Sequence, residues 1–183
     1  DGEQAALEAA RNEAAASGGL SFSEIWIAEG TYYPDEGPGG LTEATDTSFV
    51  ITGGENGLKL YGGFQNGDGF DDRSVEGAPT ILSGDLEQDD NPFAPNTDSD
   101  GDPSTPTQTD HLNGTNASSV LVFDGTGNEN ITSTTVLNGV TVTAGYADGS
   151  SFPNDRGGGL QCIGAGSGNE CSPELKNVTF SGN

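Results

Sequence analysis

Two stretches of the chain share one pattern of apolar and polar positions. Residues 137–145 read LNGVTVTAG and residues 175–183 read LKNVTFSGN, with apolar side chains at positions 1, 4 and 6 of each stretch. Strict alternation would place every second side chain on one face of a strand, so the slip after position 1 predicts a bend between two short strands. Short bent strands that return after a variable loop are typical of stacked coils. The pattern therefore predicts an all-β fold of the parallel β-helix type.

Other strand-like runs are rich in β-branched and aromatic residues and are bounded by Gly, Pro, Asn or Asp. Their unequal spacing predicts coils of two or three short strands, with insertions that project from a common core. A β-sandwich is the alternative, and it predicts more regular alternation and evenly spaced turns. The expected strands are residues 25–28, 31–33, 48–52, 58–61, 80–83, 119–123, 134–143, 159–162 and 175–180.

Two segments depart from the strand pattern. Residues 3–16 are alanine-rich and helical in pattern, with Asp1 available as an N-cap and two glycines at 18–19 as a stop. We expect residues 1–19 to form a short helix that caps the first coil of a single domain spanning residues 1–183. Residues 84–118 are long and polar, and they predict an acidic loop insertion.

The acidic composition limits the classes of partner. The chain carries 29 Asp and Glu against 5 Lys and Arg, a formal net charge of −24. So few basic residues cannot neutralise phosphates, which excludes nucleic acid and disfavours anionic membrane surfaces. No apolar run approaches the roughly 20 residues needed for membrane insertion. The carboxylates are either a solvated surface of an exported protein or sites for divalent cations, chiefly Ca²⁺, and both interpretations can hold.

Cys162 and Cys171 are the only cysteines, and a loop rich in Gly, Ser and Asn separates them. We expect a loop-closing disulfide formed in an oxidising compartment, with two free thiols as the alternative. The sequence begins at Asp1 without a Met and stops at Asn183 directly after a strand pattern. We therefore expect a segment of a longer exported protein, with its open last coil covered by further chain or by another molecule.

Residues 25–33 read IWIAEGTYY, residues 60–64 read LYGGF, Arg73 follows, and residues 80–85 read TILSGD. In this order they resemble landmarks of the pectin-lyase-like right-handed parallel β-helix proteins of the bacterial cell surface. Residues 137–145, 157–160 and 177–183 resemble later coils of that group, including the TFSGN repeat shared with polymorphic outer-membrane-protein passengers. The resemblance spans nearly the whole chain. It implies a right-handed β-helix and an extracellular location at the bacterial cell surface.

The best local motif for a metal lies in the long insertion. Residues 96–102 read NTDSDGD, which places side-chain oxygens at positions 1, 3 and 5 and Gly at 6, as in the first half of a calcium loop. Position 12 is Thr107 in place of the bidentate Glu of an EF-hand, and no helical pattern flanks the loop. We expect either a calcium-ordered loop or an ion-free flexible acidic loop. The expected ligands are Asn96, Asp98, Asp100 and Asp102, with Asp110, Asp85, Asp89 or Asp90 completing the shell.

Catalytic chemistry has less support. The resemblance implies polysaccharide cleavage as the natural candidate reaction, and glycosidases need two facing carboxylates about 5–10 Å apart. The adjacent pairs at 71–72 and 89–90 lie in loop-like sequence, which favours surface decoration. Arg73 is the basic residue closest to such a pair, and we expect it to anchor a turn by pairing with nearby carboxylates. For the aromatic residues of the first coils we expect core packing, with a carbohydrate-stacking surface as the alternative. These residues are Trp26, Tyr32, Tyr33, Tyr61 and Phe64.

Taken as a sequence, the chain favours a non-enzymatic structural or adhesive protein of a surface layer, filament, matrix or adhesin. Its expected partners are other copies of itself or other surface proteins at the open C-terminal coil. The alternative is a carbohydrate-binding or polysaccharide-cleaving module with glycans as partners. A groove lined by exposed aromatic rings and two facing carboxylates would favour that alternative.

Overall fold

A computed structural model of the protein describes residues 23–35, 47–90, 112–127 and 130–183. In these residues the regular structure is parallel strand, apart from two short 3₁₀ helices, so the expected all-β class is confirmed. The strands are β1 (Glu24–Ala28), β2 (Gly30–Tyr32), β3 (Phe49–Thr52), β4 (Lys59–Phe64), β5 (Thr80–Ser83), β6 (Leu121–Asp124), β7 (Val136–Asn138), β8 (Val140–Thr143), β9 (Leu160–Ile163), β10 (Glu174–Lys176) and β11 (Thr179–Ser181); the 3₁₀ helices are η1 (Gly53–Glu55) and η2 (Phe70–Asp72).

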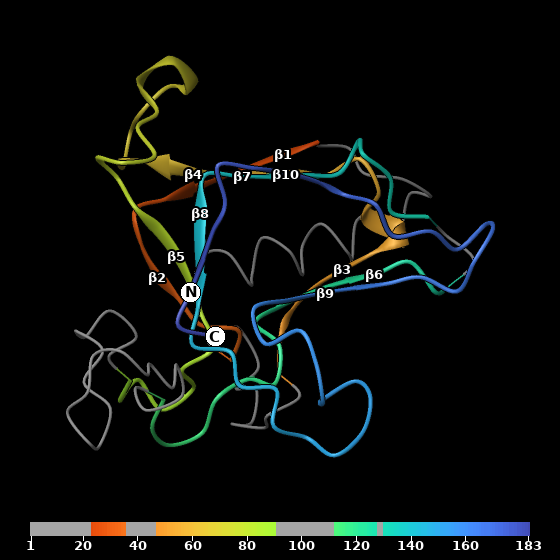
Figure 1. Cartoon of the computed structure of the whole chain (residues 1–183). Coiled ribbons are helices and arrows are strands. Elements are labelled where there is room, and N and C mark those ends of the chain that lie inside the picture. Colours follow the sequence, from red (N-terminus) through yellow and green to blue (C-terminus); the bar gives the residue numbers. More distant parts are fainter. Residues whose placement is uncertain (1–22, 36–46, 91–111, 128–129) are drawn as a thin grey trace, which may run out of the picture.

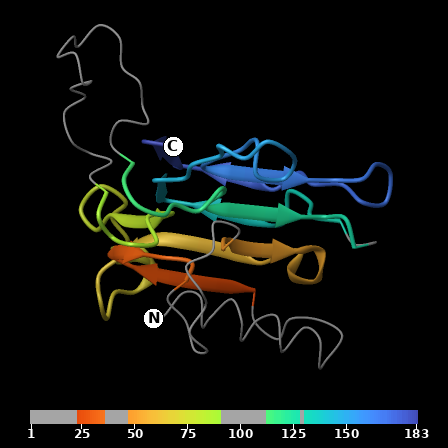
Figure 2. The same cartoon turned by 90° about the horizontal axis from the view of Figure 1, so that it is seen from below.

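The chain visits three parallel sheets in rotation. Sheet A has the order β1-β4-β7-β10, sheet B the order β2-β5-β8-β11, and sheet C the order β3-β6-β9. Viewed along the stack, the sheets lie as three sides around a common interior (Figure 1). Figure 2 shows successive passes of the chain lying above one another. We call one pass through sheets A, B and C a level.

The two stretches that echo each other in sequence are neighbours in space. Leu175 lies opposite Leu137 in the β10–β7 pair, and Phe180 lies opposite Val142 in the β11–β8 pair. The predicted bend is present in both stretches, at Gly139 with φ 77° and at Asn177 with φ 49°. Glycine and, less readily, asparagine adopt this left-handed conformation. The sequence echo therefore corresponds to the stacking register of the third and fourth levels.

Apolar side chains of successive levels stack in columns inside the three sheets. In sheet A, Ile25 lies beside Leu60 and Leu60 beside Leu137, and all three are buried. Burial of such columns supplies the main favourable free energy of folding. The buried cluster consists of Ile25, Ile27, Phe49, Ile51, Leu58, Leu60, Leu82, Val120, Leu121, Phe123, Ile131, Leu137, Val140 and Val142.

The first-coil aromatic residues do not all join this cluster. Tyr32 packs against it, whereas Phe64 is buried outside it, stacked on Trp26. Ile25 and Ile27 occupy the inward positions of β1, so Trp26 faces outward and is 47% exposed. The expectation of core packing is therefore wrong for Trp26.

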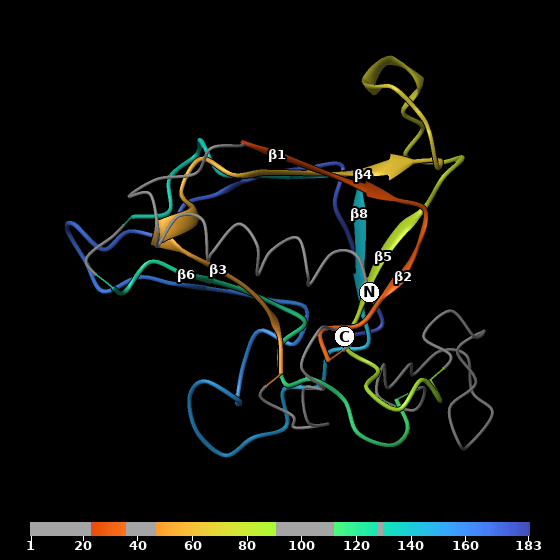
Figure 3. The same ribbon diagram turned by 180° about the vertical axis from the view of Figure 1, so that it is seen from behind.

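Insertions leave the sheets at their corners (Figure 3). Residues 65–79 connect sheet A to sheet B, and residues 84–118 connect sheet B to sheet C. The described ends of the longer insertion pair with each other: Ala117 donates its backbone N–H to Gly84 at 2.8 Å, and Leu86 donates to Thr115 at 3.1 Å. Leu86 and Ala117 are buried. The base of the predicted acidic insertion thus packs on the core.

A disulfide joins Cys162 of β9 to Cys171, with 5.6 Å between their Cα atoms, which confirms the predicted bond. Cys162 lies opposite Phe123 in the β6–β9 pair of sheet C, and Cys171 lies in the segment between β9 and β10. The disulfide therefore links the third level to the segment that leads into β10. A disulfide fits an oxidising setting.

Two expectations about the chain as a whole remain predictions. The helix expected at residues 1–19 lies outside the described residues, and the single domain expected at 1–183 includes residues outside them. Within the described ranges, no helix has the length and apolarity needed to cross a membrane.

Candidate metal centre

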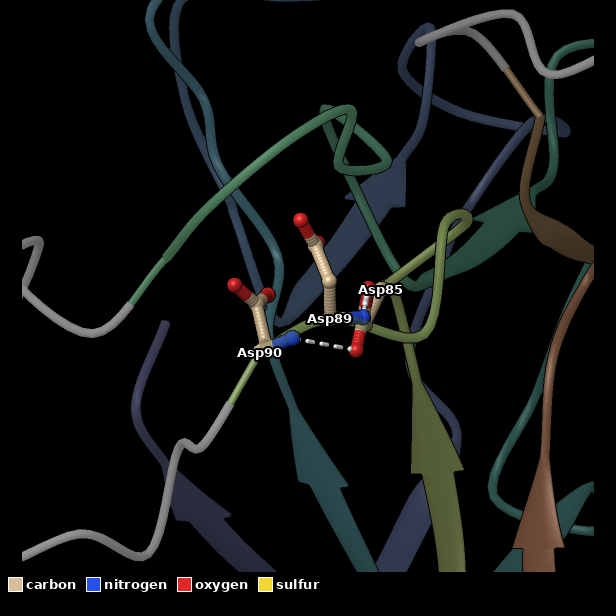
Figure 4. A group of neighbouring side chains, drawn as sticks. All are labelled: Asp85, Asp89 and Asp90. Atoms are coloured by element: carbon tan, nitrogen blue, oxygen red, sulfur yellow. Dashed lines mark hydrogen bonds between the residues drawn. The ribbon is translucent and has the colours of Figure 1, made fainter.

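Three carboxylates gather where the chain leaves β5 for the long insertion. Asp85, Asp89 and Asp90 each offer one oxygen, and these oxygens lie within 4.8 Å of one another (Figure 4). Asp85 is buried, Asp89 is exposed and Asp90 is half-buried. We call these three residues the acidic cluster.

The local turn is built around the Asp85 side chain. Its carboxylate accepts the backbone N–H of Asp89 at 3.1 Å and that of Asp90 at 2.9 Å. The Asp85 N–H donates in turn to the Ser83 hydroxyl at 3.3 Å. An aspartate that accepts backbone N–H groups a few residues further on is a common way to fix a tight turn. Asp85 therefore brings the other two carboxylates back over the end of β5.

Asp90 connects the outgoing arm of the insertion to the returning arm. Its carboxylate accepts hydrogen bonds from the backbone N–H of Asn113 and from the side-chain amide of Asn116. The same amide donates to the backbone oxygen of Ala144 at 3.1 Å, directly after β8. The cluster thus touches both arms of the insertion and, through Asn116, the next level.

A fourth carboxylate approaches the same place. A Cβ on Gly114 would lie 2.7 Å from Asp89 Oδ1 and 2.8 Å from Glu87 Oε2, and Gly114 has φ 59°. The left-handed backbone favours glycine at this turn, and an added Cβ would displace the ends of the two acidic side chains. Thr115 donates its hydroxyl to Glu87. The returning arm is therefore shaped around the acidic side chains.

The electrostatics of the cluster favour a cation. Burial is the main cause that raises the pKa of Asp90 above its ordinary value; hydrogen bonds from Asn113 and Asn116 oppose the shift, and the charges of Asp85 and Asp89 add to it. Carboxylates this close repel one another unless a cation or a proton lies between them.

The basic residues of the described part of the chain are engaged elsewhere. Lys59 pairs with Glu24, Lys176 with Glu174 and Arg156 with Asp155. Arg73 binds backbone oxygens. A set of carboxylate oxygens without a neighbouring ammonium or guanidinium is the donor set that Ca²⁺ prefers.

The structure brings together three of the residues that the sequence named for the calcium shell. Asp85, Asp89 and Asp90, each of which the sequence offered to complete the shell, lie side by side. The loop ligands Asn96, Asp98, Asp100, Asp102 and Asp110 lie outside the described residues, so the loop itself stays a prediction. Sequence reasoning missed Asn113, Gly114 and Asn116. The Asn-Gly dipeptide at 113–114 is a turn signal that could have indicated where the insertion returns.

Arg73 anchors its turn, but by contacts other than those expected. Its Nε donates to the Gly62 backbone oxygen at 2.5 Å, and its Nη2 donates to the backbone oxygen of Asn138 at 2.8 Å and to the side-chain oxygen at 3.0 Å. The guanidinium also lies over the Tyr61 and Phe64 rings. Within the described ranges Arg73 forms no ion pair with a carboxylate, so the expected pairing is wrong. Carbonyl oxygens and ring faces hold the cation in its place.

Comparison with protein-family models, with curated proteins and with solved structures finds no match to this chain. The resemblance to pectin-lyase-like surface proteins therefore stays an expectation.

Proposed function

We propose that this chain is part of a right-handed parallel β-helix with a structural and adhesive role at the bacterial cell surface. The observation that carries the proposal is the stacking of apolar side chains in columns from one level to the next. Ile25, Leu60, Leu137 and Leu175 occupy equivalent positions of neighbouring strands at successive levels. Such nearest-neighbour stacking lets a solenoid extend by adding levels, which suits stalks, layers and filaments.

The last level offers a contact surface for a partner. Leu175 and Phe180 continue the inward columns and are 41% and 46% exposed. A further level, supplied by more of the same polypeptide, by another copy of the chain or by another surface protein, would bury these side chains and pair with β10 and β11. Repeated head-to-tail contact of this kind produces a fibre.

Calcium at the acidic cluster would support this role. An ion held by Asp85, Asp89 and Asp90 would remove their mutual repulsion and fix the base of the insertion on the end of β5. The disulfide at Cys162 and Cys171 reinforces the third level in the same way, by a local cross-link. Both devices suit a protein that works outside the cell, where Ca²⁺ is abundant and thiols are oxidised.

Carbohydrate binding, the alternative function, is favoured by one specific observation. Trp26 and Phe70 present large exposed aromatic surfaces in mutual contact on the outer face of sheet A. This arrangement is compatible with an adhesive role, since an adhesin needs a recognition surface as well as a rigid body.

Analytical ultracentrifugation with light scattering tests the structural proposal. We compare the wild type with Phe180→Asp and with the control Phe152→Asp, which adds the same charge at a side chain that is 54% exposed elsewhere. The expected result is elongated particles that grow with protein concentration for the wild type and the control, and monomers for Phe180→Asp. A wild type that stays monomeric at every concentration would contradict self-assembly through the last level, as would assembly that Phe180→Asp leaves intact.

A further inference from the structure

Four aromatic rings gather on the outer face of sheet A and form what we call the aromatic face: Trp26, Tyr61, Phe64 and Phe70. Phe64 is 4% exposed and lies at the bottom of the group. Trp26 and Phe70 are 47% and 45% exposed although they contact each other and Phe64. A ring cluster that served only to anchor a loop would bury these two side chains more fully. Their exposure makes the aromatic face a candidate binding surface.

The rings are fixed by the sheet and not by a mobile loop alone. Trp26 lies opposite Tyr61 in the β1–β4 pair, and its indole stacks on Phe64 with 5.1 Å between ring centroids and 2° between planes. Phe70 of η2 meets the edge of Tyr61 at 5.3 Å and 87° and tilts against Trp26 at 5.5 Å and 52°. One face of the indole is therefore supported by Phe64, and its exposed surface is held in a set orientation.

The insertion that carries Phe70 is itself fastened. Arg73 lies 5.4 Å from the Tyr61 ring and 5.8 Å from the Phe64 ring while it donates to the backbone of Gly62 and Asn138. Phe70 and Arg73 thus close over Tyr61 and Phe64. Trp26 and Phe70 remain as the outer, open part of the face.

We propose that the aromatic face binds a neutral polysaccharide, with sugar rings stacked on Trp26 and Phe70. This inference rests on the adhesive part of the proposed function and names its partner class. The apolar C–H face of a sugar ring matches a flat aromatic surface, while the sugar hydroxyls need acceptors at its rim. Glu24 supplies a carboxylate there, since one of its oxygens already accepts the Trp26 indole N–H at 3.4 Å.

Charge argues against other occupants. The chain carries a net charge of −24, which repels polyanions. An ammonium or guanidinium ligand would be attracted by the net charge but could reach only the exposed rings of Trp26 and Phe70, so the test needs a cationic probe. Arg73 already covers Tyr61 and Phe64, and Lys59 pairs with the other oxygen of Glu24 at 3.4 Å. Ring centroids 5.1–6.1 Å apart leave no cage between the rings for a cation.

Trp26 is the only tryptophan of the chain, so intrinsic fluorescence reports this site alone. The experiment titrates the full chain with four neutral polysaccharides, namely hydroxyethylcellulose, laminarin, dextran and mannan. Polygalacturonate and poly-lysine serve as the anionic and cationic probes. Affinity gel electrophoresis with the same polymers provides the readout for variants that lack the tryptophan. The variants are Trp26→Ala, Trp26→Phe and the control Phe152→Ala, which removes an exposed ring outside the aromatic face.

The expected result is a fluorescence change with at least one neutral polysaccharide and retardation of the wild type in its gel. Trp26→Ala should bind about tenfold more weakly or worse, Trp26→Phe should recover part of the affinity, and Phe152→Ala should match the wild type. The proposal is overturned if none of the neutral polymers binds, if Trp26→Ala binds as well as the wild type, or if poly-lysine alone binds through Trp26. Particle size and calcium response of the same samples report on the structural proposal separately, so failure of the two can be told apart.

Discussion

Arg73 donates its Nη2 to the backbone oxygen of Asn138 at 2.8 Å, across 65 positions of the sequence. The bond links the insertion of the second level to the bend of the third, where Gly139 follows with φ 77°. Together with the bond from Nε to Gly62 and the contact with two aromatic rings, it gives one side chain a role in two levels. The guanidinium of Arg73 therefore stabilises the corner between sheets A and B through hydrogen bonds to backbone oxygens.

Replacing Arg73 by Lys should show how much the two guanidinium hydrogen bonds contribute to stability. Lysine keeps the charge but cannot donate to Gly62 and Asn138 from one planar group, and it loses the stacked ring contact. We expect a loss of about 2–4 kcal/mol in the free energy of unfolding, measured by urea denaturation. Arg156→Lys, at an exposed pair with Asp155, should leave the free energy of unfolding nearly unchanged. Equal effects of the two changes would contradict the anchoring role.

Gly139→Ala should destabilise the protein more than Asn177→Ala. Both positions have positive φ, and the left-handed conformation costs alanine about 1–2 kcal/mol. At Gly139 the added Cβ would also lie 2.0 Å from Arg73 Nη2, so the guanidinium has to move. In the Arg73→Lys background the excess cost of Gly139→Ala should shrink, which a double-mutant cycle measures. Simple additivity of the two changes would show that they act independently.

Opening the disulfide should weaken the third level. The chain-entropy model assigns about 2–3 kcal/mol to a closed loop of this length. Replacing both Cys162 and Cys171 by Ser should therefore lower the urea midpoint, and a reducing agent should have the same effect on the wild type but none on the double variant. A double variant as stable as the oxidised wild type would contradict a structural role for the bond.

Without calcium, Asp90 should make the protein less stable as the pH rises. Burial raises the pKa of its carboxyl in the folded protein above the ordinary value of 3.8. The stability linked to this group is fully present below that ordinary value and is lost as the pH rises through the raised pKa. In EDTA, the wild type should therefore lose stability relative to Asp90→Asn as the pH rises above 3.8 and through the raised pKa of Asp90. With saturating calcium the trend should reverse, because the metal competes with the proton. Parallel pH profiles in EDTA would show that Asp90 is not linked to folding.

The sequence predicted the parts of the fold that depend on local periodicity. The repeated apolar pattern indicates that Leu137 and Leu175 occupy equivalent positions of neighbouring strands, and Gly139 marks the bend within the pattern. The alternation of Ile25, Trp26 and Ile27 also indicates that the indole points outward, although we expected Trp26 in the core because it is aromatic. Strict period-two alternation decides the facing of a residue in a strand more strongly than its hydrophobicity.

The parts that sequence could not supply depend on contacts between distant segments. Phe70 joins Trp26 only because a fifteen-residue excursion folds back over sheet A, with η2 inside it. Asp85, Asp89 and Asp90 gather in one local turn, and Asn113 and Asn116 return to Asp90 from the far arm of the insertion. No periodic pattern encodes how an insertion of variable length closes on itself.

The most direct test of the account is thermal unfolding of the wild type, Asp89→Asn and Asp71→Asn in calcium and in EDTA. Asp89 belongs to the acidic cluster, while Asp71 lies in η2, and both are exposed, so each change removes one surface charge. At calcium about a hundredfold above the dissociation constant, the wild type and Asp71→Asn should gain about 5–10 °C in Tm. Asp89→Asn should gain much less, and its Tm in EDTA should equal or exceed that of the wild type because one repulsive charge is gone. Equal Tm values in calcium and EDTA for the wild type would contradict a structural calcium site at the base of the insertion, and so would a full calcium response in Asp89→Asn.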